Sequence, residues 1–402
     1  MNTKHDVKAK QIPKWLVFLL AAACGLIVAN LYYAQTVIGP ISATTGLSSA
    51  AAGLIVTLTQ IGYVIGLLFI VPLSDIMENR RLVTSFLVLL VIALTAAAFS
   101  THALLFLTAS LVIGVGSVVA QILVPYATYL TSEEQRGQVV GNVMSGLLLG
   151  IMLARPVASF ITDAFGWQAV FIFSAIVIAL LALLLSRALP VRQPQPAMKY
   201  GQLIASLGTL LKTLPMLRRR ALYQASLFGA FSLFWTTVPL RLANDFGMTQ
   251  QGIAWFALAG VGGAIAAPIA GRWADKGLTR ILTGLAMVIA VLSLGLAYMF
   301  QGHSTAELVL LVIVAITLDM AVSGNLVLGQ RIIYSLAGEA RGRVNGIFMS
   351  IFFIGGAVGS SIGSWSYASG GWSLTTLIGL IMPLLALGYY FTEKKASVVS
   401  NS

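Results

Sequence analysis

The chain has 402 residues, of which 58% are hydrophobic and 9% are charged, whereas soluble domains average about 45–50% and about 25%. With a mean hydropathy of +0.93, this composition excludes a soluble enzyme and a disordered chain and predicts a polytopic membrane protein. One cysteine and three histidines offer little for a disulfide scaffold or a metal cluster. We therefore expect no cofactor and no metal, and the net charge of +12 must first be explained by membrane topology.

Twelve apolar runs, each about long enough to cross a hydrocarbon core of roughly 30 Å as a helix, follow one another along the chain. Their length favours helices over the shorter alternating strands of an outer-membrane barrel, so the predicted fold class is all-α with twelve transmembrane helices. The runs lie at about 15–38, 51–72, 82–99, 103–125, 139–162, 167–186, 221–240, 252–271, 280–300, 307–330, 344–367 and 372–391.

The basic residues occur almost entirely at one side of this predicted topology. All 24 lysine and arginine residues except Arg155 and Arg241 lie in the terminal segments or in the even-numbered breaks between runs. Cytoplasmic loops carry such an excess of positive charge. The sequence therefore predicts a multi-pass protein of the bacterial cytoplasmic (inner) membrane with both termini in the cytoplasm.

The second half of the chain repeats features of the first half. A long basic break at 187–220, with four prolines and no acidic residue, separates six runs from six. Four features recur at a constant offset of 205 residues: Arg136-Gly137 as Arg341-Gly342, Gly141 as Gly346, Gly150 as Gly355, and Gly166-Trp167 as Gly371-Trp372. Such self-similarity indicates an internal duplication. We expect a six-helix bundle at 1–186, a cytoplasmic linker at 187–220 and a second six-helix bundle at 221–402.

The loop after the second run contains a short charged motif, and the loop after the eighth run contains a second copy. The first reads Val-Pro-Leu-Ser-Asp-Ile-Met-Glu-Asn-Arg from Val71 to Arg80, and the second begins at Gly271 and ends at Arg280. With the six-plus-six repeat, these copies resemble the major facilitator superfamily, whose signature loop reads Gly-x-Leu-x-Asp-x-x-Gly-x-Arg. The resemblance covers nearly the whole chain and implies two pseudo-symmetric bundles, although each copy departs from the signature at some positions.

The resemblance implies a gating role for the charged residues of the two copies, which are Asp75, Arg80, Asp275 and Arg280. A carboxylate against the N-terminal end of another helix is stabilised by about 0.3–2 kcal/mol. In the family's geometry the first aspartate faces the start of helix eleven near Arg343, and the second faces the start of helix five. These contacts would keep the cytoplasmic side closed until substrate binding reverses the bias. The alternative role is a helix stop with a topological anchor.

Asp319 lies near the middle of the tenth run, where a carboxylate costs at least about 2.5 kcal/mol unless it faces the bundle interior or water. The 205-residue offset places it opposite Gly114, so the acid is not part of the duplicated scaffold. Desolvation favours the neutral carboxyl. We therefore expect Asp319 to carry a proton or bind a cation, and a structural hydrogen bond is the alternative.

Arg155 lies in the fifth run, roughly seven residues from the predicted outer end. It follows Gly146 and Gly150, whose spacing predicts close helix packing. The segment resembles the Gly-x-x-x-Gly-Pro antiporter signature of the family, with Ala154 for the second glycine and the arginine inserted before Pro156. Two roles stay open for this arginine: it binds an anionic ligand or acts in gating, or it pairs with a carbonyl or a lipid phosphate.

In the family, helices one, four, seven and ten line the substrate cavity, so the polar and aromatic residues of these runs are further candidates. Ordinary helix packing is the alternative for each of them. The residues we select for proton or substrate binding, in addition to Asp319 and Arg155, are Asn30, Tyr32, Gln35, Gln121, Gln224 and Trp235. A mostly apolar, aromatic lining suits an amphipathic small molecule.

The sequence as a whole predicts a secondary transporter and not an enzyme, because no nucleotide-binding motif and no catalytic constellation is present in it. It resembles the bacterial drug:proton antiporter branch, which implies proton-coupled efflux of amphipathic or drug-like compounds. Ser110 departs from that branch, where an arginine is common. The alternatives are uptake of a small organic anion at Arg155 and a membrane sensor that moves nothing. We expect a monomer in the lipid bilayer, with protons as coupling ion and without nucleic acid.

Overall fold

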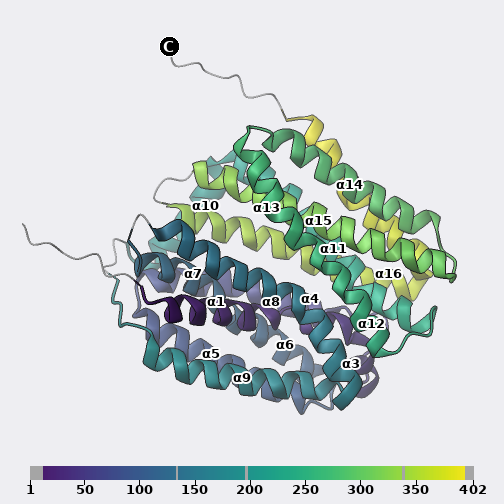
Figure 1. The fold of residues 1–402 in the computed structure, drawn as a ribbon, viewed down its shortest axis with the longest axis horizontal. Helices are drawn as coiled ribbons and strands as arrows, with labels where there is room; N and C mark the ends of the chain where they lie inside the picture. The colour runs from purple at the N-terminus through teal and green to yellow at the C-terminus, as the bar shows by residue number, and fades with distance from the viewer. Residues whose placement is uncertain (1–11, 133–134, 195–197, 337–339, 394–402) are drawn as a thin grey trace, which may run out of the picture.

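The computed structural model describes residues 12–132, 135–194, 198–336 and 340–393, and the regular elements in these ranges are all helical (Figure 1). In chain order they are α1 (Lys14–Ala29), α2 (Tyr33–Thr36), α3 (Ile38–Thr45), α4 (Leu54–Ile65), η1 (Gly66–Ile70), η2 (Val71–Asp75), α5 (Asn79–Ala98), α6 (Ala103–Ser117), α7 (Val119–Tyr129), α8 (Arg136–Phe165), α9 (Trp167–Ala188), α10 (Tyr200–Thr213), α11 (Pro215–Asn244), α12 (Gln250–Ala257), η4 (Leu258–Val261), α13 (Gly262–Asp275), α14 (Thr279–Met299), α15 (Thr305–Leu336) and α16 (Arg341–Phe391).

The twelve predicted runs are all present as helices. Within the described residues, nine helical segments are long and apolar enough to cross a membrane. One of them, α16, comprises two helices joined at Gly370 and Gly371, where φ of +63° at Gly371 suits a residue without a side chain. The remaining two spans are α11 and the first run, in which the regular helix breaks between Ala29 and Tyr33.

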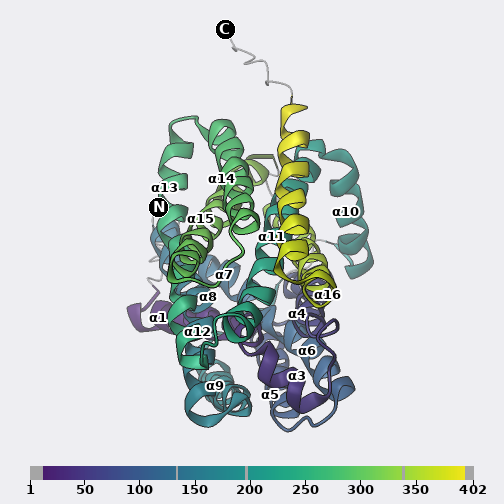
Figure 2. The same ribbon diagram turned by 90° about the vertical axis from the view of Figure 1, so that its right-hand side faces the viewer.

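The helices form two bundles, one from α1 to α9 and one from α11 to α16, which lie on opposite sides of a central interface (Figure 2). In each bundle the first and fifth spans touch backbone to backbone. A Cβ on Gly150 would overlap the backbone of Gly25 in α1, and a Cβ on Gly359 would overlap the backbone of Gly229 in α11. This contact confirms the predicted packing role of Gly150 and repeats the same design in both bundles.

The predicted linker contains a helix, α10, which the sequence analysis did not predict. Its leucines pack against the main core, and its polar face bonds to both bundles. The Tyr200 hydroxyl donates to the Phe69 carbonyl at 2.8 Å, and Arg343 Nη1 of α16 donates to Ser206 Oγ at 2.8 Å. The linker helix α10 therefore contacts the basic-residue-rich ends of both bundles.

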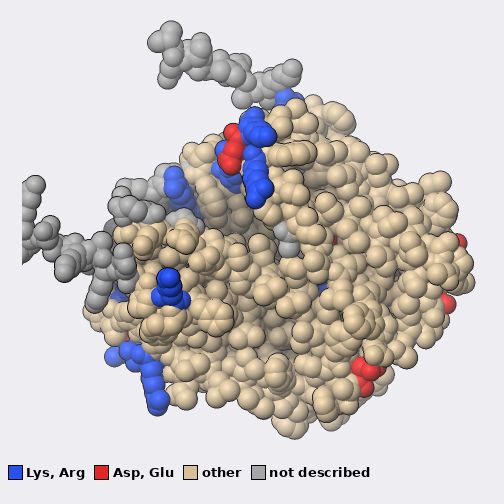
Figure 3. Space-filling model, in the orientation of Figure 1, with Lys and Arg blue, Asp and Glu red and all other residues tan. Residues whose placement is uncertain are grey.

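Figure 3 shows the basic side chains toward one end, with one acidic patch among them, and the other acidic side chains toward the opposite edge. We call the end that carries Asp75 and Asp275 the basic end. Hydrogen bonds at the opposite end join the bundles directly: Thr57 Oγ1 lies 2.8 Å from Ser360 Oγ, and the Gln251 amide donates to Asp163 Oδ1 at 3.2 Å. The bundles are therefore clamped at the end opposite the basic end.

Candidate functional site

Arg155 lies inside the protein, with 1% of its surface exposed, ten residues before the end of α8 at Phe165. The guanidinium points toward the first span, where Arg155 Nε donates to Gln35 Oε1 at 2.7 Å. The backbone of Arg155 also contacts the first span, since Thr36 Oγ1 donates to the Arg155 carbonyl oxygen at 3.2 Å. Of the roles left open for this arginine, pairing with a lipid phosphate does not fit, because the residue is deeper than the sequence placed it and its guanidinium faces the first span.

Three aromatic rings surround the Arg155 guanidinium. Its Cζ atom lies 4.2 Å from the Trp235 ring centroid, 4.9 Å from that of Phe231 and 5.3 Å from that of Tyr32. Cation–π attraction contributes about 2 kcal/mol or more per contact when the groups are desolvated. Tyr32 belongs to the first bundle and the other two rings belong to α11, so the cation lies where the bundles meet.

Asp319 of α15 approaches the same place from the second bundle and is 5% exposed. Its Oδ2 accepts a hydrogen bond of 2.8 Å from Trp235 Nε1. A Cβ built on Gly260 would lie 3.1 Å from Arg155 Nη1 and 3.7 Å from Asp319 Oδ1. Opposite charges thus flank one glycine, where even a methyl group would be crowded.

Some donors at this site have no protein partner. Among the described residues, Arg155 Nη2 and Gln35 Nε2 are buried without a hydrogen-bond acceptor. A buried donor left unpaired costs about 1–3 kcal/mol, and more if it is charged. The site therefore offers unsatisfied hydrogen bonding to a polar ligand or to water, within walls that are aromatic.

The structure gathers five of the residues selected from the sequence, namely Tyr32, Gln35, Arg155, Trp235 and Asp319. Other selected residues have partners elsewhere. Asn30 Oδ1 accepts from Ser174 Oγ at 2.6 Å, and Gln224 donates to the Val322 carbonyl at 3.1 Å and accepts from Asn325 at 2.6 Å. Gln121 is half-buried on α7. For Asn30 and Gln224, the packing alternative describes their contacts better than ligand binding does.

Sequence reasoning did not select Gly260. The available signal was the cluster of three glycines at 260, 262 and 263. They lie where the short 3₁₀ helix η4 meets the start of α13, in the middle of the eighth span. Gly263 likewise meets Asp319, because a Cβ there would lie 3.2 Å from the Asp319 carbonyl oxygen. Small residues let this broken span approach the charged pair closely.

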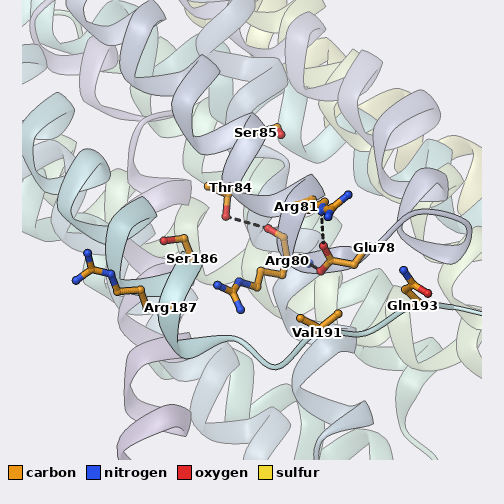
Figure 4. A pocket seen from close by; sticks show the side chains of 9 residues that line it. All are labelled: Glu78, Arg80, Arg81, Thr84, Ser85, Ser186, Arg187, Val191 and Gln193. Atoms are coloured by element: carbon orange, nitrogen blue, oxygen red, sulfur yellow. Dashed lines mark hydrogen bonds and ion pairs between the residues drawn. The ribbon is translucent and has the colours of Figure 1, made fainter.

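The four residues with a predicted gating role lie at the basic end. The charges acting on Asp75 come from Arg192 and Arg343, the latter in the opposite bundle as expected. Asp275 forms an ion pair with Arg331 of its own bundle, where we expected a contact with the other bundle. Arg280 Nη2 donates to the Glu393 carbonyl at 2.6 Å, and Arg80 lines a pocket between α5 and α9 (Figure 4).

Comparisons with known proteins agree with this architecture. The sequence matches the Major Facilitator Superfamily over residues 17–231 and 220–402. It is 40% identical to the uncharacterized transporter YgaY of Escherichia coli O157:H7, over 92% of this chain and 94% of that protein. It is 30% identical to the probable transporter SCO4007 of Streptomyces coelicolor, over 88% of this chain and 82% of that protein.

Among solved structures, a bacterial homologue of the human lysosomal transporter Spinster, in an inward-facing and occupied conformation, superposes with a TM-score of 0.76. The two sequences are 14% identical, and the match covers 94% of this chain and 96% of that one. This likeness concerns the fold, which has two six-helix bundles as expected. On the sequence match along nearly its whole length, the chain belongs to the Major Facilitator Superfamily.

Proposed function

We propose that this membrane transporter couples the efflux of a small amphipathic molecule to proton movement, with Asp319 as the proton carrier. The observation that carries the proposal is the juxtaposition of buried Asp319 and buried Arg155 at the interface of the bundles. In family transporters of this design, a midplane site is exposed alternately on the two sides by rocking of the bundles.

The electrostatics of the pair support proton coupling. With both groups charged, the site is neutral, and each charge offsets part of the other's desolvation. Protonation of Asp319 leaves the Arg155 cation without its partner and weakens the attraction that draws α15 toward α8. A proton thereby changes the interaction between bundles, as a coupling ion must do if it is to shift a conformational equilibrium.

The lining supports an amphipathic substrate. Tyr32, Phe231 and Trp235 provide broad apolar surfaces, and Gln35 with Arg155 provides donors without acceptors. Binding sites for small molecules combine such a lining with a few convergent polar groups. The direction of transport, efflux, rests on the resemblance of the fifth span to the family's antiporter signature.

The same reasoning assigns the sides of the membrane. We place the basic end and both termini in the cytoplasm of the cell, because positive residues gather in cytoplasmic loops of inner-membrane proteins. The contacts of Thr57 and Asp163 then close the outer side in this structure. Asp75, Arg80, Asp275 and Arg280 act at the inner gate. The units extend over 1–186 and 221–402, joined by the linker 187–220, in a monomer.

Proteoliposomes loaded with a pH-sensitive dye test this function. A panel of lipophilic cations and organic anions is added to vesicles with the wild type, with Asp319→Asn and with Glu307→Gln, which removes a carboxylate from the first turn of α15, outside the site and outside the contacts between the bundles. We expect substrate-driven proton movement in the wild type and the control and its loss in Asp319→Asn. Equal proton movement in all three proteins would refute the role of Asp319, and absence of any solute flux would favour a sensor.

A second candidate function, uptake of a small organic anion, is favoured by the unpartnered Nη2 of Arg155. An anion there, together with a protonated Asp319, would keep the site neutral. In the same vesicles, anions but not cations would move protons, and Arg155→Gln would abolish the response. A response to cations that survives Arg155→Gln would contradict this alternative.

A further inference from the structure

A second candidate binding site lies outside the central interface, at the basic end of α5 and α9. The two helices pack side by side, and their ends enclose a pocket of about 560 Å³ (Figure 4). The residues that line it are Glu78, Arg80, Arg81, Thr84, Ser85, Ser186, Arg187, Val191 and Gln193. The lining therefore contains three guanidinium groups, three hydroxyl groups and a single carboxylate, and the Arg81 side chain is 88% exposed.

That carboxylate is already engaged. Glu78 Oε1 accepts from the Arg80 amide at 2.8 Å, capping the start of α5, and Glu78 Oε2 pairs with Arg81 Nε at 3.4 Å. Within the described residues, neither Arg80 nor Arg187 has a carboxylate partner for its guanidinium. In Figure 4 the Arg80 side chain extends from α5 toward the end of α9, where Ser186 and Arg187 lie, whereas the Arg187 guanidinium is directed away from Arg80. Within the part of the chain that the structure describes, the pocket therefore keeps two positive charges without a paired carboxylate.

The surface next to the pocket is apolar and faces outward. On α5, Val88 and Ile92 continue the face on which Ser85 lies, one and two turns away from the pocket. On α9, Leu183 and Leu180 precede Arg187 by one and two turns and are about half exposed. A charged pocket is thus continuous with two apolar stripes that run along a membrane-spanning pair of helices.

We propose that this pocket binds the phosphate of an anionic phospholipid, whose acyl chains lie along the exposed stripes of α5 and α9. Arginine matches the geometry and charge of phosphate oxygens, and basic pockets at helix ends bind anionic lipid headgroups. A free phosphate ion would use the same arginines but not the apolar stripes, so the stripes favour the lipid.

Native mass spectrometry of the purified full chain in detergent micelles tests the proposal. Phosphatidylglycerol is titrated against a background of zwitterionic phosphatidylcholine, and the apparent affinity is measured for each variant. A basic residue near a membrane surface contributes about 1 kcal/mol, so we expect Arg80→Gln with Arg187→Gln to weaken phosphatidylglycerol binding about 25-fold. Arg80→Lys with Arg187→Lys keeps both charges and should retain most of the affinity.

The matched control is Arg272→Gln with Lys276→Gln, which removes two exposed cations from the basic end of α13 outside the pocket. This control should change the affinity less than twofold. An equal loss in both double variants would overturn the proposal in favour of general surface charge. Displacement of the lipid by inorganic phosphate at the same micromolar concentration would overturn it in favour of a site for a soluble anion.

Discussion

Removal of either charge from the central pair should destabilise the protein strongly, and removal of both should restore much of the stability. In Asp319→Asn the Trp235 indole keeps an acceptor, because the amide oxygen replaces the carboxylate oxygen bonded at 2.8 Å. What changes is the charge beside Arg155, which is 1% exposed and forms no salt bridge within the described residues, so Asp319 acts on it across the space next to Gly260.

The size of the effect follows from the separation of the charges. Arg155 Nη1 and Asp319 Oδ1 lie 3.1 Å and 3.7 Å from one point beside Gly260, so they are at most about 7 Å apart. Two unit charges about 5–7 Å apart interact by about 2–3 kcal/mol at an effective dielectric constant of about 20. Breaking a buried pair from one side costs about 3–5 kcal/mol, since one charge stays buried and uncompensated. We therefore expect each of Asp319→Asn and Arg155→Gln to lower the apparent free energy of unfolding by about 3 kcal/mol, and the double variant to lose about 3 kcal/mol less than the sum.

The single cysteine provides the assay. Cys24 is fully buried in α1, so a thiol-reactive fluorophore reports its exposure as the protein unfolds in increasing concentrations of sodium dodecyl sulfate. A Cys24→Ala variant supplies the blank. Additive losses in the double variant would show that the two charges do not interact, and would refute the reasoning on which the proton-coupling proposal depends.

Three further outcomes follow from other contacts. Gly150→Val should abolish stable folding by forcing a side chain into the α1 backbone, whereas Gly141→Val, with open space around it, should leave thermal stability in detergent unchanged. Glu393→Gln should lower the free energy of unfolding by about 3–5 kcal/mol, because Glu393 forms a buried ion pair with Arg220. Asp275→Asn should lower it by only about 0–1 kcal/mol, because the ion pair with Arg331 is exposed. A similar loss of stability in both variants would contradict the importance of burial. Thr57→Val removes a hydrogen bond between the bundles that contributes about 0.5–1.5 kcal/mol. The variant should therefore exchange amide hydrogens in the loop before α4 about twofold to tenfold faster. An unchanged exchange rate would count against a clamp at that end.

The twelve spans and the duplication could be predicted from the sequence because both depend on local composition and on spacing along the chain. A run of apolar residues needs no tertiary partner to be recognised in a membrane protein. The helix α10 was not predicted, since the prolines and positive charges of the linker obscured its leucine pattern at 203, 207, 210 and 214. The first span was predicted as continuous, and nothing in its hydropathy indicated the break after Ala29.

The candidate site was predicted only as a set of residue types on the correct helices. Asp319 and Arg155 were selected because charge is rare within spans, but their proximity is a contact between distant parts of the chain that no local pattern contains. The same limit explains Asn30 and Gln224, whose amides bond to neighbouring helices and satisfy their polar atoms there. Gly260 was not selected because a glycine has no functional group, and its role here is to leave room for Arg155 and Asp319.

The contacts between the first and fifth spans also separate what the two bundles share from what each bundle has alone. The seam occurs in both bundles, at Gly25 with Gly150 and at Ala225 with Gly355, the 205-residue counterpart of Gly150, so it belongs to the duplicated scaffold. The charged pair is different, because the 205-residue offset sets Arg155 opposite Ser360 and Asp319 opposite Gly114. Each charge exists in one copy only. The charged centre is therefore not part of the duplicated scaffold, and each bundle supplies one of its two charges.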